Sequence, residues 1–599
     1  MASPAQDNDR DHIGRESSKF NWRNALSPTL YVFLLLISFS AFKLYILESE
    51  SREFLGCHWC LSNKAVIFEL RFLFIVATLH LFGEIAQKRW LRFTSRLLLI
   101  LVVLITAIDL AVFKQFWMRF TLYKLEEYSF EWSAIESVLH FTFTGSANAW
   151  LEIAGSILTI GVLVRYLFTK RIGSSRPLAL GICCLGVLFL GAFEPKEFHF
   201  KHMQNSIEAF FASMSIQKPY SENFYKTIVG KQSTKQTCIG GRDERPNLIL
   251  LLIESQSMYH SKLFSGLNDW MPEFDEVSKH GKRFTNFYAN GVSTEQGLIS
   301  LFTGEPPISK GVNNARTEFE QFSHTKETIP KLLNGFGYRT EFLTTGDLSF
   351  LNKKQWLQDI GFTHAEGHDA HYYDGMMRYT FNAPADEALY GRALKELQVL
   401  KAQSSLPYFL TLETVTTHMP FYDPVSGTRS QELAFRYADK QLGMFVKQLK
   451  AIGYFNNGYL MVMGDHRAMT PATQEEWALY GDRAYSRIPF AMVGSGLMGE
   501  VEKGTFSQND LLPSLKHWLG KGNQCITADQ GVYLPYAIKS PTCVITHRAY
   551  GVNTIYPQCA NEDYVVELNG DNTHYVEGKT GPASLITEIN GLRLNLGFR

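Results

Sequence analysis

Five long apolar stretches precede residue 200, and they constrain the fold of this 599-residue chain more than any other feature. Each stretch is close to the ~17–25 residues that a helix needs to cross a bilayer. Buried core helices are the alternative, but no soluble pattern competes across the five stretches. They cover residues 30–47, 65–85, 97–113, 150–168 and 177–193. The sequence therefore predicts a five-helix transmembrane domain over residues 30–197, integral to the membrane.

The loops between these stretches differ in charge. The loops after the second and fourth stretches are rich in Lys and Arg, whereas those after the first and third contain several Glu residues. Because basic loops face the cytoplasm, we expect residues 1–29 to form a cytoplasmic tail. Everything after residue 197 is then expected outside the cytoplasmic membrane of a bacterium, in the periplasmic or extracellular space. Glu69, Arg71 and Asp109 lie inside the membrane part, where charges are costly, so we expect pairing or contact with lipid headgroups.

From residue 245 onward, short apolar runs alternate with helical segments. This pattern is typical of an α/β fold with a mostly parallel central sheet. We assign residues 198–243 to a connector, 244–522 to the α/β domain and 523–599 to a C-terminal β-rich subdomain. Strands are expected at 247–253, 284–289, 339–345, 407–412, 459–463 and 489–493, and helices at 294–303, 327–336, 385–401, 431–452 and 509–519. Two β-like runs, 564–568 and 592–596, predict a small C-terminal strand layer.

Charge and cysteine content narrow the class of protein. The 58 basic residues balance the 58 acidic ones, which argues against a nucleic-acid partner. Four cysteines lie in the region expected outside the membrane, where disulfides form. They allow three pairings, among which the sequence does not choose: Cys238, Cys525, Cys543 and Cys559.

Polar residues stand where three elements of the expected sheet end. Glu254 follows the run 247–253, and Asp465 and His466 follow the run 459–463. Thr294 lies between a strand-like run and a helix-like one. An open α/β sheet builds its polar site at the carboxyl ends of its strands, and Glu, Asp and His together are a metal-ligand set. Thr294 also suits the start of a helix as a capping residue, a role that Ser293 is equally able to fill.

In this order, these residues resemble the membrane-anchored phosphotransferases of the alkaline phosphatase and sulfatase superfamily, especially lipoteichoic acid synthase-type phosphoglycerol transferases. The resemblance implies that Thr294 is the nucleophile. It also implies that Glu254, Thr294, Asp465 and His466 hold one divalent metal ion. Oxygen ligands with one imidazole suit Mn²⁺, Zn²⁺ or Mg²⁺, and the family precedent favours Mn²⁺ or Zn²⁺.

The same resemblance implies a set of substrate contacts. His418 stands in a His-x-Pro segment, where the family places a substrate-contacting histidine, and its imidazole is able to protonate a departing alkoxide. A family Trp-Asn-Arg motif is matched only at Asn352, because Leu351 and Lys353 replace the other two residues. A lysine does not grip a phosphate in the bidentate way of an arginine. Asp347, Asn352 and Lys353 are the expected substrate contacts of this segment.

Other polar residues receive a plainer interpretation. His364, His368 and His371 fit a solvated loop better than a second metal site. Asp439 and Asp510 match family positions that are structural.

The sequence favours one function and leaves two alternatives. Residues Thr294 to Leu298 lack the Pro and Arg that a formylglycine-dependent sulfatase requires. We therefore expect a metal-dependent transfer of phosphoglycerol from phosphatidylglycerol, a membrane phospholipid, to an envelope glycan or lipid acceptor through a phosphothreonine-type intermediate. A phosphoethanolamine transferase acting on lipopolysaccharide or lipid A is the first alternative, although no cysteine surrounds Thr294 as in that class. A non-catalytic lipid-binding regulator is the second, although the four expected metal ligands are retained.

Overall fold

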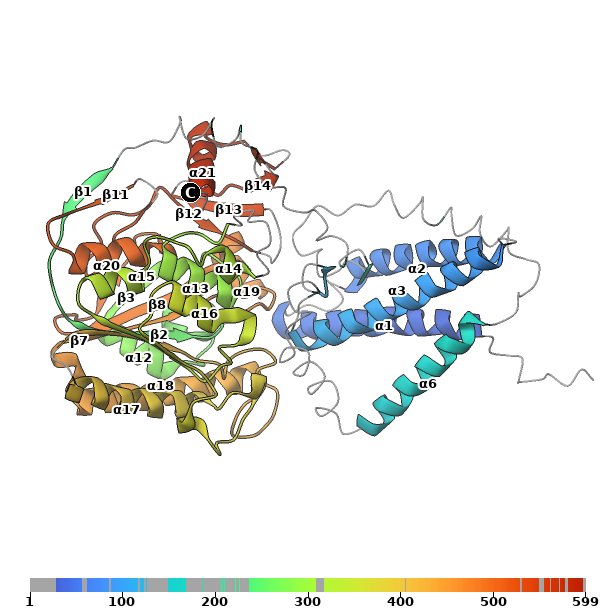
Figure 1. Cartoon of the computed structure of the whole chain (residues 1–599), viewed down its shortest axis with the longest axis horizontal. Helices are drawn as coiled ribbons and strands as arrows, with labels where there is room; N and C mark the ends of the chain where they lie inside the picture. Colours follow the sequence, from blue (N-terminus) through green and yellow to red (C-terminus); the bar gives the residue numbers. More distant parts are fainter. Residues whose placement is uncertain are drawn as a thin grey trace, which may run out of the picture. The chain divides into compact units, whose positions relative to one another are not determined.

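The computed structural model describes residues 28–55, 62–85, 88–116, 149–168, 236–308, 317–403, 406–527, 530–548, 554–560, 562–569, 571–576 and 580–595, with single residues and short runs between 119 and 226. The chain divides into two compact units, one of residues 1–43, 69–106 and 150–194, the other of residues 44–68, 107–149 and 195–599. Figure 1 labels the helices and strands. Apart from residue 186, the apolar stretch predicted at 177–193 lies outside the described residues.

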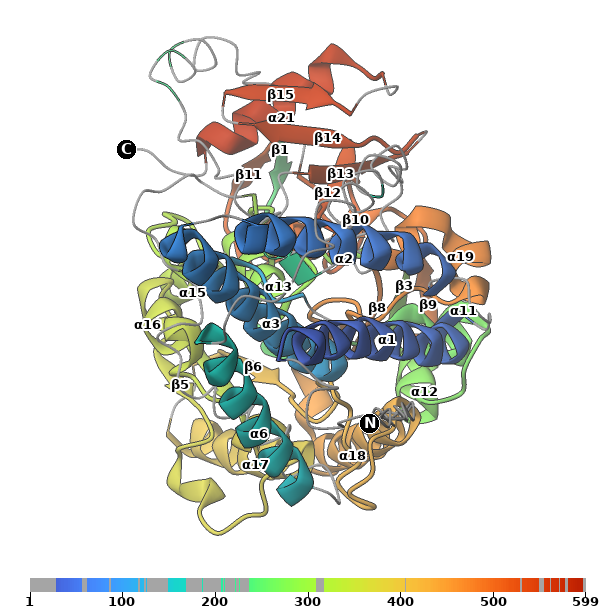
Figure 2. The same cartoon turned by 90° about the vertical axis from the view of Figure 1, so that its right-hand side faces the viewer.

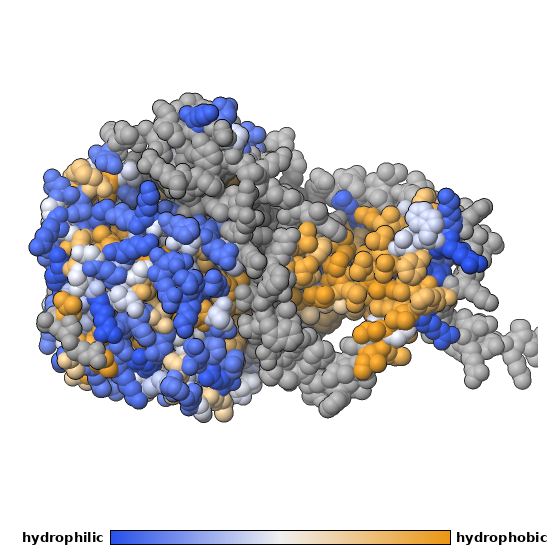
Figure 3. Space-filling view, in the orientation of Figure 1, coloured by the Kyte–Doolittle hydropathy of each residue, from blue (hydrophilic) through white to orange (hydrophobic). Residues whose placement is uncertain are grey.

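Three N-terminal helices are long and apolar enough to cross a membrane. They are α1 (Pro28–Leu55), α2 (Ser62–Ile85) and α3 (Arg89–Phe116). Their surface is largely apolar (Figure 3), which suits contact with lipid. Helix α6 (Ala149–Leu167) contributes only the shorter apolar segment Ile157–Leu167. The prediction of five spans is therefore corrected to three candidate spans in the described part of the chain.

Charged residues inside these helices are paired. Glu69 lies 2.5 Å from the Nζ of Lys43 and accepts a hydrogen bond of 2.6 Å from the Ser40 hydroxyl. Asp109 lies 2.6 Å from the guanidinium of Arg119. An isolated charge within a bilayer is costly, so these contacts account for the acidic residues in otherwise apolar helices. The expectation of pairing is confirmed for Glu69 and Asp109.

The α/β domain is built on a nine-stranded sheet. Its path runs β10 (Phe506–Ser507), β3 (Lys282–Tyr288), β8 (Arg487–Gly494), β7 (Gly458–Gly464), β2 (Asn247–Ile253), β6 (Tyr408–Glu413), β4 (Arg339–Thr344) and β5 (His364–Glu366), with β9 (Glu500–Glu502) beside β3. Strand β8 runs antiparallel to β3 and β7, and the other pairings are parallel. The sheet is therefore mixed, and the six predicted strands are present at its centre.

Strand β2 shows why both faces of the sheet are covered. Leu248, Leu250 and Leu252 pack into one apolar core, and the residues between them pack into a second. Alternate residues of a strand point to opposite faces, so a continuous apolar run predicts burial on both sides. Helices α13 (Thr294–Thr303), α15 (Ile329–Gly335), α16 (Lys353–Asp359) and α20 (Leu511–Leu519) supply the first core, and α12 (Pro272–His280), α17 (Asp386–Gln403) and α18 (Gln431–Ala451) supply the second (Figure 1).

A smaller antiparallel sheet follows near the C-terminus. It consists of β12 (Cys543–Thr546), β13 (Thr554–Cys559), β14 (Val566–Asn569) and β15 (Asn572–Tyr575). Helix α21 (Ala583–Asn595) packs beside it (Figure 2). The strand predicted at 592–596 is wrong over residues 592–595, because these residues belong to α21. Buried Leu585 and Ile589 stand four residues apart, which is the spacing of a helix face rather than of a strand.

Two disulfides resolve the pairing that the sequence left open. Cys238 of β1 (Thr237–Gly240) is bonded to Cys525 of β11 (Asn523–Ile526), and these two strands pair antiparallel. Cys543 and Cys559 join β12 to β13. Both disulfides therefore join residues that are directly opposite each other on paired strands.

Candidate active site

Neighbouring strands β2 and β7 bring three predicted site residues together. Their register pairs Ile253 with Gly464, so the residues that follow, Glu254 and Asp465, emerge at the same edge of the sheet. His466 is next along the chain. The side chains of Glu254, Asp465 and His466 are all buried, and one ligand atom from each lies within 4.8 Å of the others.

Thr294 joins this group from the first residue of α13. Its Oγ1 donates to the Oε2 of Glu254 at 3.2 Å and lies 3.4 Å from the Nε2 of His466. The capping role belongs to Ser293, whose hydroxyl accepts the backbone N–H of Gln296. The Thr294 hydroxyl is therefore available for chemistry at a helix N-terminus, where backbone amides and the helix dipole favour an anionic group.

The tautomer of His466 fixes the direction of its lone pair. Its Nδ1 lies 2.8 Å from the carbonyl oxygen of Arg467. A carbonyl only accepts hydrogen bonds, so Nδ1 carries the hydrogen and, in the neutral ring, Nε2 carries the lone pair. This Nε2 lies 3.4 Å from Glu254 Oε1 and 3.4 Å from Asp465 Oδ2. A lone pair directed at two carboxylate oxygens is repulsive unless a positive charge lies between them.

The unsatisfied oxygen of Asp465 points to the same conclusion. Its Oδ1 accepts the backbone N–H groups of Ser255 at 2.9 Å and His466 at 2.8 Å. Its Oδ2 is buried and has no hydrogen-bond partner among the described residues. Buried charged oxygens without partners are costly. Glu254, Asp465 and His466 therefore fit a divalent metal ion, and theirs is the one group of metal-ligating side chains in the described part of the chain that does so.

The electrostatics of the three side chains are those of a site with excess negative charge. Burial and then the charge of Glu254 raise the pKa of Asp465 to about 8. Burial alone would lower the pKa of His466, but Asp465 and Glu254 outweigh it and raise that pKa to about 9. Burial alone would raise the pKa of Glu254, but His418 and His466 outweigh it, so that pKa lies below its usual range. A retained proton on His466 supplies the positive charge that a cation would otherwise provide.

A layer of hydroxyl groups holds Glu254 in place. Ser255, in a left-handed conformation with φ of 59°, donates its hydroxyl to Glu254 Oε1 at 2.7 Å. Thr414 accepts the backbone N–H of Glu254 at 3.0 Å, and Thr417 donates to its backbone carbonyl at 2.6 Å. Sequence reasoning missed these three residues. The only signal for them was their position directly after Glu254 and at the end of β6.

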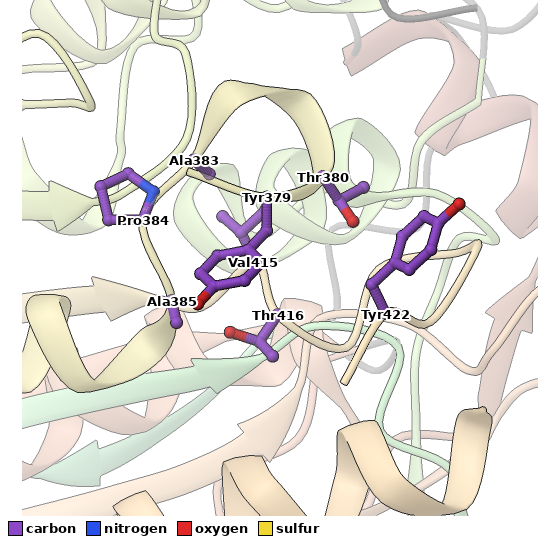
Figure 4. A pocket seen from close by; sticks show the side chains of 8 residues that line it. All are labelled: Tyr379, Thr380, Ala383, Pro384, Ala385, Val415, Thr416 and Tyr422. Carbon is purple, nitrogen blue, oxygen red and sulfur yellow. The ribbon is translucent and has the colours of Figure 1, made fainter. Parts of the chain in front are cut away.

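His418 follows this layer on the same loop. Its Nδ1 lies 2.6 Å from the carbonyl of Met419, so Nδ1 carries a hydrogen and Nε2 is left for proton exchange. The ring of Phe381 packs edge-on against the imidazole at 4.6 Å. Beside this loop lies a small pocket (Figure 4). It is lined by Tyr379, Thr380, Ala383, Pro384, Ala385, Val415, Thr416 and Tyr422, which supply hydroxyl and apolar groups and no charge.

Two of the other expected substrate contacts, Lys353 and Asp347, are bonded to other residues of the chain. The Nζ of Lys353 lies 2.5 Å from both carboxylate oxygens of Glu413, and both side chains are buried. The structure thus places the Lys353 charge in an internal ion pair rather than in the open site. Asp347 accepts the backbone N–H of Ser349 at 2.8 Å and its hydroxyl at 2.7 Å. Asn352 is exposed, with φ of 60°.

Strained backbone gathers around the same loops. Six of the seven non-glycine residues with positive φ in the described chain flank the site residues: Ser255, Leu351, Asn352, Phe381, Asn382 and Phe421. Such backbone conformations cost energy. They persist where the surrounding structure holds the backbone in place, and they cluster at functional sites. The distribution supports this edge of the sheet as the functional one.

The remaining histidines and aspartates are structural. His364 and His371 contact Glu366 and Asp374 on the same short segment, as expected for a solvated loop. Asp439 accepts the backbone N–H groups of Glu273 and Phe274 at the start of α12. Asp510 accepts the backbone N–H of Ser507 at 3.0 Å and that of Gly531 at 2.5 Å. The structural interpretation of both aspartates is confirmed.

Comparison with known proteins identifies the domain that carries this site. Residues 246–521 match the sulfatase family model. The chain is 26% identical over 255 residues to lipoteichoic acid synthase 1 of Bacillus subtilis (strain 168), a match covering 39% of this chain and 37% of that relative. It is 24% identical over 265 residues to phosphoglycerol transferase I of Xanthomonas axonopodis pv. citri (strain 306), covering 41% and 36% respectively.

These matches span little more than a third of each relative's own length. Among solved structures, a protein in the alkaline phosphatase superfamily from Vibrio parahaemolyticus is 19% identical, with a TM-score of 0.47. That likeness covers 64% of this chain and 97% of the other. The region that matches the sulfatase family model contains all of the predicted site residues, from Glu254 to His466.

Proposed function

We propose that this chain is a membrane-anchored, metal-dependent phosphotransferase. In this proposal it moves phosphoglycerol from phosphatidylglycerol to an envelope glycan or lipid acceptor through an intermediate on Thr294. The observation that carries the proposal is the position of the Thr294 hydroxyl, 3.2 Å from Glu254 Oε2 and 3.4 Å from His466 Nε2 at the start of α13. The likeness to proteins named lipoteichoic acid synthase and phosphoglycerol transferase supports the choice of group.

Glu254, Asp465 and His466, with Thr294 as the fourth ligand, would hold the cation. When bound, a divalent ion supplies charge neutralisation and lowers the pKa of a hydroxyl beside it. Two oxygen donors and one imidazole suit Mn²⁺ or Zn²⁺, with Mg²⁺ also compatible. We expect one such ion per chain.

The reaction consists of two displacements at one phosphorus atom. Thr294 Oγ1 releases its proton to solvent and forms a bond to the phosphorus, while the bond from phosphorus to the diacylglycerol oxygen breaks. Nε2 of a protonated His418 donates the proton that this oxygen needs to leave as diacylglycerol. An acceptor hydroxyl then passes its proton to Nε2 of His418 and bonds to the same phosphorus, while the bond from phosphorus to Thr294 Oγ1 breaks and Oγ1 takes up a proton from solvent. Asp347 and Asn352 are proposed to line the path of the glycerol headgroup.

The location follows from the membrane helices and the disulfides. The three candidate spans in the described part of the chain support a membrane anchor. The basic loops of the sequence favour a cytoplasmic N-terminus with the α/β domain on the outer side. Two disulfides in that part of the chain suit an oxidising compartment. We therefore propose a multi-pass protein of the bacterial cytoplasmic membrane with the domain in the periplasmic or extracellular space. A lipid donor is then presented on the side where the site lies.

Release of diacylglycerol tests the proposal. The full chain is placed in vesicles that contain either phosphatidylglycerol or phosphatidylethanolamine, with Mn²⁺ present. We expect diacylglycerol only from phosphatidylglycerol and none from Thr294→Ala. Thr328→Ala, which removes the hydroxyl that caps α15, is the matched control and should retain turnover. Release from phosphatidylethanolamine alone would indicate the other transferase class, and no release from either lipid would indicate a non-catalytic regulator.

A further inference from the structure

Asn290 lies four residues before Thr294, and each of its polar groups is hydrogen-bonded. It is fully buried. Its amide Nδ2 donates to the carbonyl of Ile545 at 2.8 Å, and its Oδ1 accepts the backbone N–H of Asn509 at 3.1 Å. Its backbone carbonyl accepts the N–H of His547 at 2.8 Å. A fully satisfied buried polar network fixes a unique local arrangement, because each displaced group would be left without a partner.

Gln508 connects this residue to the strand that carries the metal ligands. Its Oε1 accepts the backbone N–H of Asn290 at 3.2 Å. Its Nε2 donates to the carbonyls of Asp465 at 2.6 Å and Gly464 at 3.2 Å. One buried amide therefore links the loop before the nucleophile to the end of β7. Sequence reasoning did not find it, since the residues involved are more than 40 positions apart.

Helix α13 and the residues at the end of β7 are in close backbone contact. A Cβ atom placed on Gly297 of α13 would lie 2.2 Å from the carbonyl oxygen of Asp465 and 3.6 Å from Gln508 Nε2. The helix that begins at Thr294 is thus in direct backbone contact with the strand end that supplies Asp465. Small movements of either segment would change the distance between the nucleophile and the metal ligands.

The C-terminal sheet anchors the other side of Asn290. Both of its contacts there are to backbone atoms, the carbonyl of Ile545 in β12 and the N–H of His547 just after it. Strand β12 pairs with β13, and the Cys543–Cys559 disulfide joins the two. The anchor is therefore set by the position of a strand rather than by a mobile side chain.

We propose that Asn290 and Gln508 are positioning residues that hold the Thr294 hydroxyl at its working distance from Asp465, and that β12 is the anchor of this bridge. The inference rests on the proposed function for its effect on turnover. It deepens that function by assigning the C-terminal sheet a role in the reaction. The two residues differ in one respect: Gln508 bonds the Asp465 segment directly, whereas Asn290 is joined to that segment through Gln508.

The test compares Gln508→Met and Asn290→Leu in the full chain. We expect Gln508→Met to weaken Mn²⁺ binding about 10- to 100-fold, as loss of a supporting contact does, and Asn290→Leu to leave it unchanged. At saturating Mn²⁺, kcat for diacylglycerol release should fall about 100-fold in both variants, with the KM for phosphatidylglycerol vesicles unchanged. Asn334→Leu is the matched control, because Asn334 bonds Gly361 and Thr340, which are not among the site residues, and this variant should lose stability without loss of kcat.

Changes in melting temperature alone, with kcat and Mn²⁺ affinity as in the Asn334→Leu control, would overturn the proposal. Should Asn290→Leu not fold, Asn290→Asp, which keeps the acceptor for Asn509, carries the same comparison. A wild-type chain that does not turn over phosphatidylglycerol would refute the proposed function. In that case the Mn²⁺ affinity of Gln508→Met still decides whether the bridge supports the metal ligands.

Discussion

The substitution Gly297→Ala tests the close packing of helix α13 against the end of β7. The Cβ atom of an alanine there would lie 2.2 Å from the carbonyl oxygen and 3.0 Å from the carbonyl carbon of Asp465. Non-bonded heavy atoms are most favourable at about 3.5–4.0 Å, so α13 and the end of β7 must separate by about 1 Å or more. A misplacement of about 1 Å costs on the order of 100-fold in rate. Overpacking of this kind also destabilises a fold by about 1–3 kcal/mol.

Gly297→Ala should therefore lower kcat for diacylglycerol release about 100-fold and also lower the melting temperature of the full chain. Gly335→Ala is the matched control. Gly335 is the last residue of α15 and is exposed, and nothing lies within 4 Å of an added Cβ. That substitution should keep full turnover and raise stability by about 0.5–1 kcal/mol. Wild-type turnover and stability in Gly297→Ala would refute the close contact between the nucleophile helix and the metal-ligand strand.

Three further predictions follow from individual side chains. Asp465→Asn should lower Mn²⁺ affinity by more than about 100-fold, measured by equilibrium dialysis, and abolish turnover; unchanged metal content would remove Asp465 from the site. Burial lowers the pKa of His547 to about 4 from its ordinary 6.5, so the folded protein binds fewer protons than the unfolded chain between these values. Stability should therefore be lost as the pH falls from about 6.5 to 4, by roughly 3 kcal/mol, and His547→Leu should flatten this dependence in denaturant titrations at several pH values. Lys353→Met should destabilise the fold by about 3–5 kcal/mol by leaving the buried Glu413 carboxylate unpaired, and adding Glu413→Gln should restore most of that loss. A Lys353→Met variant with unchanged melting temperature and a raised KM would instead assign Lys353 to the substrate.

The strands and the candidate metal-ligating group could be predicted because their signals are local. A seven-residue apolar run ending on Glu254 describes a strand buried on both faces and a polar side chain at its carboxyl end. The Asp465–His466 pair repeats this arrangement on β7, and the parallel pairing of β2 with β7 then brings the residues together. The choice of Ser293 over Thr294 as the capping residue was not decided by the sequence, because both side chains carry a hydroxyl.

Other features depend on contacts that a linear sequence does not display. The ion pair of Lys353 joins residues 60 positions apart, so its burial could not be anticipated from the motif around Asn352. The bridge through Gln508 joins three segments of the chain. The run at 592–596 alternates like a strand over five residues, but Leu592 continues the helical face that begins at Leu585. Hydropathy alone also overstated the number of membrane spans in the described part of the chain.

The central claim is that Thr294 carries the transferred group, and peptide mass spectrometry tests it most directly. The full chain is incubated with phosphatidylglycerol and Mn²⁺ without acceptor, digested, and searched for a modified peptide containing Thr294. The account predicts one phosphoglycerol group on that peptide and none in Thr294→Ala. An adduct that persists in Thr294→Ala, or that maps to another residue, would contradict it.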